Sequence, residues 1–453
     1  MPREGTVPTI IVEVTGQPGA CLLTAFPATI VASFDRAGGH LMPSAKFFAW
    51  HFMSYPYLPD DFDEKYDTGW VTVPNKLWDS ERSADLYQEY IDQLVYGEEL
   101  GFDGLVLNEH HQNVYGLMPS PNIIAAALTQ RTSRAQIVVL GNLISLHANP
   151  LRIAEEYAMI DMMSKGRLVA GFAVGGGPEA FNYNQSSAIS RRRYWEAIDL
   201  VVRAWKDEGP FEHEGPEYPL RYVNIWPKTR QKPHPPVWIP GSLSIETMEE
   251  TAKRGFCYFL SSRVHGSATR AAANRFADVI KSHGDSFHPF RMGVLLSVYV
   301  SETDESAREE ASEGVFYFLR NCLKGHLRRV GRTQTFGPGI PSQSVKSWEQ
   351  FLRNSKPGED RLGDAKSWEE LDAGGSIICG SPATVRKRLW ELIELAGVGN
   401  FLIQFHFGNM KAEHARKSMR LFATEVLPHL RSQSSDLFAR DYPQLEAMAG
   451  AAP

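Results

Sequence analysis

Four side chains suited to proton transfer or hydrogen bonding follow one another directly, as Asn108, Glu109, His110 and His111. They come at the end of an apolar run that is typical of a buried strand. An imidazole exchanges protons near neutral pH, and the neighbouring carboxylate of Glu109 can orient it. Adjacent histidines also occur in solvated loops and in structural hydrogen bonds. The position of this run in the fold therefore decides between the catalytic and the structural interpretation.

Two further segments have residue types that can bind an anion. Gly175 and Gly176 open a glycine run whose N–H groups and conformational freedom suit either an anion cradle or the hinge of a lid. The run is not the dinucleotide fingerprint GxGxxG, because no compact unit of strand, turn and helix surrounds it. Gly241 and Ser242 stand just ahead of a predicted helix, where hydroxyl and N–H groups form an anion site. Simple N-capping by Ser242 or Ser244 is the alternative.

The elements that must position these residues are short apolar runs alternating with longer helical patterns. The expected strands are 46–52, 103–108, 136–142, 167–174, 237–240, 256–261, 292–300 and 400–406. The expected helices are 81–100, 122–131, 151–163, 191–205, 245–253, 269–282 and 383–395. Eight strands alternating with helices predict an α/β protein folded as a closed (β/α)8 TIM barrel, in which each strand ends in a loop on the active face. A doubly wound open sheet is the alternative that strand counting leaves open.

We place the barrel, with one insertion, at residues 42–435. The insertion and the two ends of the chain are not needed for a minimal barrel. Residues 303–375 form an expected insertion before the last helix and strand, with a helical stretch near 306–323 and a Gly-, Pro- and Ser-containing segment at 331–344. We expect it to lie over the barrel mouth. Residues 1–41 precede any barrel pattern, and we hypothesise that they are an extension and that translation begins at Met42. Residues 436–453 form an expected C-terminal tail.

The overall composition excludes several classes of protein. The chain has 453 residues, 43% of them hydrophobic, and a formal net charge of −6, which gives no general attraction to nucleic acid or to an anionic membrane. The four cysteines, Cys21, Cys257, Cys322 and Cys379, show no CxxC pattern, as expected of a reduced intracellular protein. The apolar stretch 20–33 is too short to span a bilayer and lacks the features of a secretory signal. We expect a cytoplasmic protein.

Several motifs occur in a characteristic order. A Gly-Phe-Asp strand runs into Glu109-His110-His111, and Asn149-Pro150-Leu151-Arg152 and Met163-Ser164-Lys165-Gly166-Arg167 follow it. Further along come 233–239 (PHPPVWI) before Gly241-Ser242, and 380–385 (GSPATV) near the C-terminus. In these motifs, over residues 46–262 and 380–430, the sequence resembles the bacterial luciferase-like, flavin-dependent monooxygenase family.

This resemblance implies a (β/α)8 barrel that binds reduced FMN at its mouth, with a separate flavin reductase supplying the cofactor. Oxygen then adds to the flavin ring, and the resulting peroxyflavin oxidises a small organic substrate. His110 matches the catalytic histidine of the family, and His111 and Glu109 are its orienting neighbours. The resemblance does not fix the oligomeric state, and a homodimer is one of the alternatives. The protein's part is to exclude water and to position the cofactor.

The resemblance also implies that the candidate anion-binding segments and the end of the third strand bind the flavin. Asn142, at the end of the third strand, either forms a turn or hydrogen-bonds the flavin ring. Gly175, Gly176, Gly241 and Ser242 are expected to bind the cofactor, with Ser242 on its phosphate. Many members of the family carry an arginine for that phosphate where this chain has Val174. Arg191-Arg192-Arg193 is a candidate source of the missing charge, or a solvated helix face.

Two other functions remain open. The first is a hydrolytic barrel with zinc bound by Glu109, His110 and His111, which is disfavoured because adjacent histidines do not easily face one ion and no second ligand cluster is found. The second is a deazaflavin-dependent dehydrogenase, or a flavin-binding protein without turnover, on the same barrel. We therefore expect no metal.

Overall fold

A computed structural model describes residues 43–324 and 367–445, except for the short gaps 67, 71–72, 176, 184, 186, 262–266 and 374. The proposed extension at 1–41, the glycine- and proline-containing segment at 331–344 and the last residues of the proposed tail lie outside these ranges. In the described part of the chain, no helix is long and apolar enough to cross a membrane.

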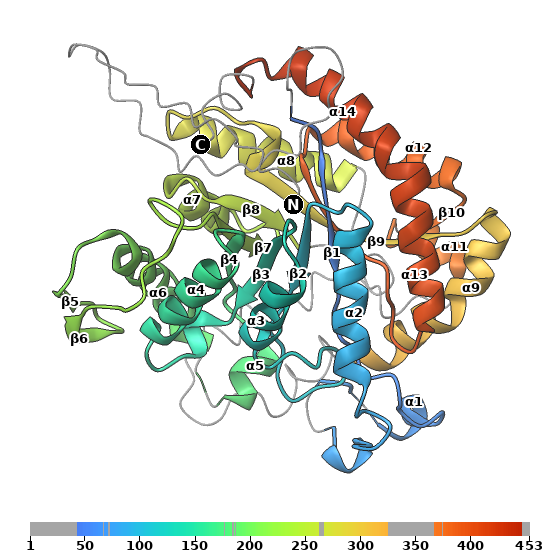
Figure 1. Cartoon of the computed structure of the whole chain (residues 1–453), viewed down its shortest axis with the longest axis horizontal. Helices are drawn as coiled ribbons and strands as arrows, with labels where there is room; N and C mark the ends of the chain where they lie inside the picture. The colour runs from blue at the N-terminus through green and yellow to red at the C-terminus, as the bar shows by residue number, and fades with distance from the viewer. Residues whose placement is uncertain are drawn as a thin grey trace, which may run out of the picture.

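Eight parallel strands form a closed barrel at the centre of the molecule (Figure 1). They are β1 (Lys46–Trp50), β2 (Gly104–Leu107), β3 (Gln136–Asn142), β4 (Leu168–Phe172), β7 (Val237–Gly241), β8 (Cys257–Leu260), β9 (Met292–Val300) and β11 (Asn400–Gln404). Each strand pairs with the next in this order, β8 pairs with β9, and β11 closes the circle by pairing with β1. The predicted TIM barrel is confirmed, and closure excludes the open doubly wound sheet. All eight expected strands are found, some shorter than predicted.

Helices surround the barrel (Figure 1). They are α1 (Phe62–Lys65), α2 (Leu86–Glu99), α3 (Pro121–Arg131), α4 (Leu151–Met163), α5 (Gly177–Asn182), α6 (Ser187–Lys206), α7 (Ile245–Lys253), α8 (Ser267–Ser282), α9 (Asp304–Tyr317), α11 (Trp368–Ala373), α12 (Pro382–Ala396), α13 (Ala412–Leu421) and α14 (Leu427–Asp441). The start of α12 shows how local signals set these bounds. Ser381 Oγ accepts a hydrogen bond from the Thr384 N–H, and Pro382 occupies the first helical position.

The strands are apolar on both faces because both faces are covered. In β3, Val138 and Leu140 pack inside the barrel, whereas Ile137 and Val139 pack against the surrounding helices. Large rings fill the interior, and Trp238 stacks on Phe259 with ring centroids 4.6 Å apart. The barrel is therefore a packed core, and a ligand site must lie at the mouth where the strands end.

Smaller elements extend the barrel. A hairpin of β5 (Phe211–Glu214) and β6 (Pro219–Val223) follows α6, and a short strand β10 (Ile378–Gly380) pairs with the end of β9. The insertion begins with α9 and the π-helical turn η4 (Phe318–Cys322), close to the predicted helical stretch. The proposed start of the C-terminal tail at 436 falls inside α14, where Leu437 and Phe438 are buried. Further short helical turns are η1 (Asn75–Leu77), η2 (Ile144–Leu146), η3 (Pro289–Arg291) and η6 (Phe422–Val426).

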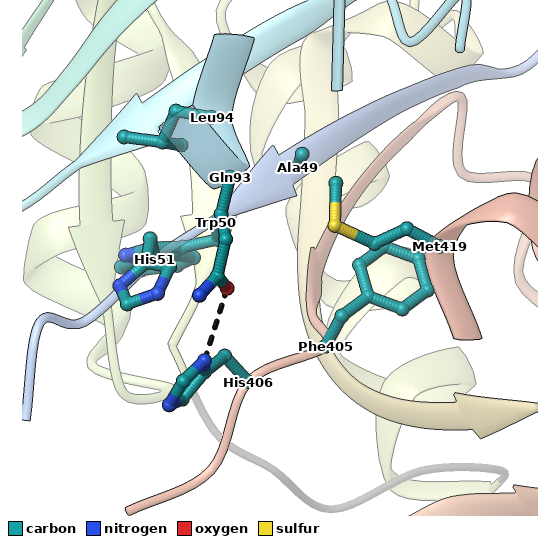
Figure 2. Close-up of a pocket in the computed structure, with 8 residues that line it drawn as sticks. All are labelled: Ala49, Trp50, His51, Gln93, Leu94, Phe405, His406 and Met419. Atoms are coloured by element: carbon teal, nitrogen blue, oxygen red, sulfur yellow. Dashed lines mark hydrogen bonds between the residues drawn. The ribbon is translucent and has the colours of Figure 1, made fainter. Parts of the chain in front are cut away.

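A small cavity between β1, α2 and the residues after β11 is lined by two buried histidines, His51 and His406 (Figure 2). His51 Nδ1 accepts a hydrogen bond from the Met53 N–H. His406 Nδ1 lies 2.9 Å from Oε1 of Gln93, whose own amide N–H₂ donates to Glu89. His406 therefore donates to Gln93. The imidazole of His406 faces α2 on the helix side of the barrel and is engaged there.

Both histidines are held neutral. Burial lowers the pKa of His406 to about 4. Burial, and then the nearby His406, lower the pKa of His51 well below its ordinary value. The ring centroids are 4.9 Å apart, so protonation of both rings would place two positive charges in contact inside the core.

The free energy of unfolding is expected to fall as the pH drops from about 6.5 toward 4. The unfolded chain binds protons at histidine near pH 6.5, whereas folded His406 stays neutral until about pH 4, so protons favour the unfolded chain in this window. For His406 alone the effect reaches about 3 kcal/mol. Urea unfolding across this pH range should show a shallower dependence for His406→Gln than for the wild type. The exposed His429→Gln serves as control, and equal pH dependence in all three proteins would contradict this assignment.

Candidate active site

The predicted histidine pair lies where β2 ends, at the mouth of the barrel. Asn108 contacts Trp50, and His110 contacts Trp70 and Tyr115, which all belong to the interior aromatic cluster, so both side chains lie on the inner side of the chain. Glu109 and His111 lie on the other side. Both are buried, at 5% and 6% exposure. The two histidines therefore have different environments even though they are adjacent.

His110 is paired with a carboxylate from a distant part of the chain. Its Nδ1 lies 2.9 Å from Oε1 of Glu179 on α5. An ionised carboxylate can only accept, so the proton of this hydrogen bond belongs to Nδ1 of His110. In neutral His110, Nε2 is then the atom that takes up a proton. The Glu179 side chain is 3% exposed and that of His110 is 21% exposed, so the imidazole stands between a sealed carboxylate and the mouth.

His111 has both ring nitrogens engaged. Nε2 lies 2.7 Å from Oε1 of Glu109, and Nδ1 lies 2.9 Å from the hydroxyl of Tyr183. Because the carboxylate accepts, Nε2 carries the proton and Nδ1 accepts from the tyrosine. The second oxygen of Glu109 accepts from the N–H of Leu143, just after β3. Glu109 and His111 thus tie together the segments that follow β2, β3 and β4, and this arrangement suits an orienting role.

Glu179 and Tyr183 were not predicted from the sequence. Both come from α5 and the residue after it, and the Asn182 amide adds a hydrogen bond to the His111 carbonyl. They lie about 70 positions after the histidines in the chain, so spacing within one motif carries no signal of them. In Figure 1, α5 lies at the lower end of the barrel.

Aromatic rings form the wall beside His110. The rings of Trp70 and Tyr115 meet its imidazole edge to face, with centroids 5.2 and 4.8 Å away. Trp50, the last residue of β1, and Phe52 just after it stack on each other at 4.8 Å in the same interior cluster. These rings exclude water from one side of the imidazole.

Asn142 does not lie with His110. Its side-chain amide exchanges two hydrogen bonds with that of Asn122 on α3, at 2.9 and 3.2 Å. Regular alternation would place Asn142 on the interior face with Val138 and Leu140. The pairing of β3 with β4 shifts register between Val139 and Asn142, and this irregularity turns the side chain toward the helices.

Gly175 serves the turn that leads to α5. It has a φ of +86°, a conformation that residues with a side chain rarely adopt, and it connects β4 to the helix that carries Glu179. Its conformation is thus required to bring the carboxylate back to His110. Gly176 lies outside the described residues.

The start of α7 is open to a ligand. Ser244 occupies the N-cap position, but no side chain caps the helix, so the capping interpretation of the two serines is not supported. Ser242 is exposed, and its hydroxyl contacts only that of Ser261, at 3.3 Å, among the described residues. Arg191 on α6 reaches the first turn of α7, where it donates to Thr247 and lies 3.7 Å from the exposed Glu246 carboxylate. Uncapped N–H groups, a hydroxyl and a cation together suit a phosphate.

The remaining predicted anion-site residues have other partners. Gly241 faces the ring of Tyr258, which fills the space that a side chain would need, so packing alone requires glycine there. Arg192 pairs with Glu217, and Arg193 donates to the His147 carbonyl. Among the described side-chain contacts of the three arginines, only those of Arg191 reach α7.

The geometry does not favour a metal centre at the histidine pair. His110 and His111 contact different carboxylates, Glu179 and Glu109. Within the described ranges, no group of three His, Cys, Asp or Glu side chains is arranged to hold an ion.

Known proteins resemble this chain in sequence and in fold. The oxygenase component of a flavin-dependent trigonelline monooxygenase from Acinetobacter baylyi is 25% identical over 252 residues, which cover 53% of this chain and 67% of that protein. The crystal structure of the monooxygenase RslO1 from Streptomyces bottropensis matches with a TM-score of 0.64 and 22% identity, over 85% of this chain and 99% of that one. An F420-dependent secondary alcohol dehydrogenase shares the fold at a TM-score of 0.57 and 12% identity, over 86% and 99% of the two chains.

The family model described as luciferase-like monooxygenase matches residues 68–399, which include six of the eight barrel strands, all except β1 and β11. This range also contains the paired histidines, α5 and the start of α7. The chain belongs to the luciferase-like monooxygenase family.

Proposed function

We propose that the chain is the oxygenase of a two-component monooxygenase that binds reduced FMN at the barrel mouth and uses O₂ to oxidise a small organic substrate. The main support for this proposal is the setting of His110 at the mouth. Its Nδ1 is hydrogen-bonded to the buried Glu179, which leaves Nε2 available for proton transfer. Family membership supports the choice of reaction. A relative named as an oxygenase component supports a separate flavin reductase as the partner.

The residues at the mouth fit a flavin. The uncapped start of α7, with Ser242 and Arg191, would hold the phosphate. Arg191 would replace the arginine that many family members carry at the position of Val174. The aromatic wall around His110 would face the ring system. When bound, the flavin supplies the redox chemistry with oxygen.

The protein side chains then divide the remaining work. His110 holds or gives up a proton at Nε2, and Glu179 fixes its tautomer and orientation. Glu109, His111 and Tyr183 position the segment that carries it. Trp70 and Tyr115 keep water from the imidazole.

The overall proposal is tested by anaerobic titration with reduced FMN and, separately, with reduced F420, followed by mixing with O₂. Tight binding of reduced FMN and rapid oxygen-dependent reoxidation are expected. Preferential binding of F420 would replace the proposal by a deazaflavin-dependent dehydrogenase. Binding of FMN with no reaction beyond that of free flavin would leave a binding protein.

His110→Ala should leave the affinity for reduced FMN nearly unchanged and lower product formation by roughly 100-fold, the usual size of one general acid–base contribution. The measurement is single-turnover oxidation of a substrate chosen by screening the wild type. His429→Ala, an exposed substitution, is the control. Equal turnover in His110→Ala and wild type would remove the proposed role.

Glu179→Leu should lower product formation in a single turnover, because it removes the acceptor that fixes the tautomer and orientation of His110. Glu179→Gln keeps an acceptor for Nδ1 and should retain more of the activity. Both variants should bind reduced FMN like the wild type, with the exposed Glu305→Gln as control. Equal product formation in Glu179→Leu and Glu179→Gln would remove the orienting role of Glu179.

Ser242→Ala should weaken binding of reduced FMN by about 1–2 kcal/mol, the contribution of one hydrogen bond to a charged group. Riboflavin, which lacks the phosphate, should bind both proteins equally. Ser286→Ala, on an exposed loop before β9, is the control. Unchanged FMN affinity would place the phosphate elsewhere.

A further inference from the structure

The side-chain amide of Asn108, at the end of β2, has a buried donor without a partner. Asn108 is 4% exposed, and its Oδ1 lies 3.3 Å from Nε1 of Trp50. An indole N–H can only donate, so this contact fixes which end of the amide is oxygen. Nδ2 has no hydrogen-bond partner among the residues that the structure describes. A buried donor in this state is costly, which makes a ligand the natural partner.

The amide lies on the inner wall of the mouth, on the same side as His110. Asn108 lies two residues before His110 and two after Val106, whose side chain packs in the interior. Its partner Trp50 belongs to that interior cluster as well. Since the chain runs toward the mouth here, Asn108 lies deeper than His110, and a ligand that contacts both extends inward past the histidine.

A continuous set of aromatic rings connects Asn108 to His110. Trp50, which holds the amide, stacks on Phe52, and Phe52 meets Tyr115 with centroids 5.1 Å apart. Tyr115 in turn contacts His110. These surroundings suit an uncharged, largely apolar ligand, because burying an anion against rings would be unfavourable. The two described carboxylates beside the pair of histidines, those of Glu109 and Glu179, would also repel an anion.

We infer that Nδ2 of Asn108 donates a hydrogen bond to an uncharged carbonyl oxygen of the bound ligand; where the substrate supplies this oxygen, the contact selects apolar substrates that carry a carbonyl group. The inference rests on the proposed function. Two carbonyl sources share this chemistry: the substrate and the pyrimidine part of the flavin. A carbonyl accepts in the plane of its substituents, so one donor from the wall also sets the orientation of the ligand relative to His110.

Two substitutions isolate the donor. Asn108→Asp keeps an oxygen that can accept from Trp50 and replaces the N–H₂ group by a second acceptor. Asn108→Leu keeps a similar volume and removes all hydrogen bonding. The exposed Asn75→Asp controls for the added charge. Far-UV circular dichroism and the melting temperature establish that each variant is folded, and either Asn108 variant alone suffices for the comparison.

Binding is measured at equilibrium, without turnover, by calorimetry. The probes are reduced FMN, then cyclohexanone and methylenecyclohexane, which have the same shape but differ in the carbonyl group. The ketone and the alkene are titrated both with and without bound flavin. The wild type should bind cyclohexanone at least tenfold more tightly than methylenecyclohexane if the substrate supplies the carbonyl. Both Asn108 variants should then lose this preference and keep their FMN affinity.

If the flavin supplies the carbonyl, both variants should instead bind reduced FMN at least tenfold more weakly than Asn75→Asp does. Unchanged FMN affinity, together with an unchanged or absent ketone preference, would overturn the inference. Failure of the wild type to bind reduced FMN would overturn the proposed function. The ketone titrations without flavin would still decide whether Asn108 recognises a carbonyl.

Discussion

The site depends on two carboxylates, each of which binds a different one of two adjacent imidazoles. Glu179 takes Nδ1 of His110, and Glu109 takes Nε2 of His111. These contacts fix opposite tautomers in neighbouring residues, so one ring keeps a nitrogen for chemistry while the other has both nitrogens engaged. Without the return of α5 to the end of β2, His110 would lose its carboxylate partner, whereas His111 would keep Glu109.

The barrel makes this division possible because all its parallel strands end at one mouth. The segments after β2, β3 and β4 meet there, and the left-handed conformation of Gly175 turns the chain toward α5. The interior below is filled by rings such as Trp238 and Phe259, which limits a ligand to the mouth. The uncapped start of α7, beside Arg191, offers an anion site at the same end.

Much of this architecture could be predicted from the sequence, because strands buried on both faces give unbroken apolar runs. The bounds of β3, β9, α4 and α7 agree with the predicted ranges. The side of Asn142 could not be predicted, since a register shift between β3 and β4 reverses the alternation there. Glu179 and Tyr183 were also missed, because contacts between residues some 70 positions apart depend on the path of the chain and not on motif spacing. The exposed β5–β6 hairpin carries too weak an apolar pattern to be expected.

The most direct test of the account is a crystal structure of the protein soaked anaerobically with reduced FMN. The account predicts that the flavin ring lies in the barrel mouth within contact distance of His110, that Glu179 still holds Nδ1, and that the phosphate lies at the start of α7. A flavin bound elsewhere, or a His110 imidazole turned away from it, would contradict the central claim.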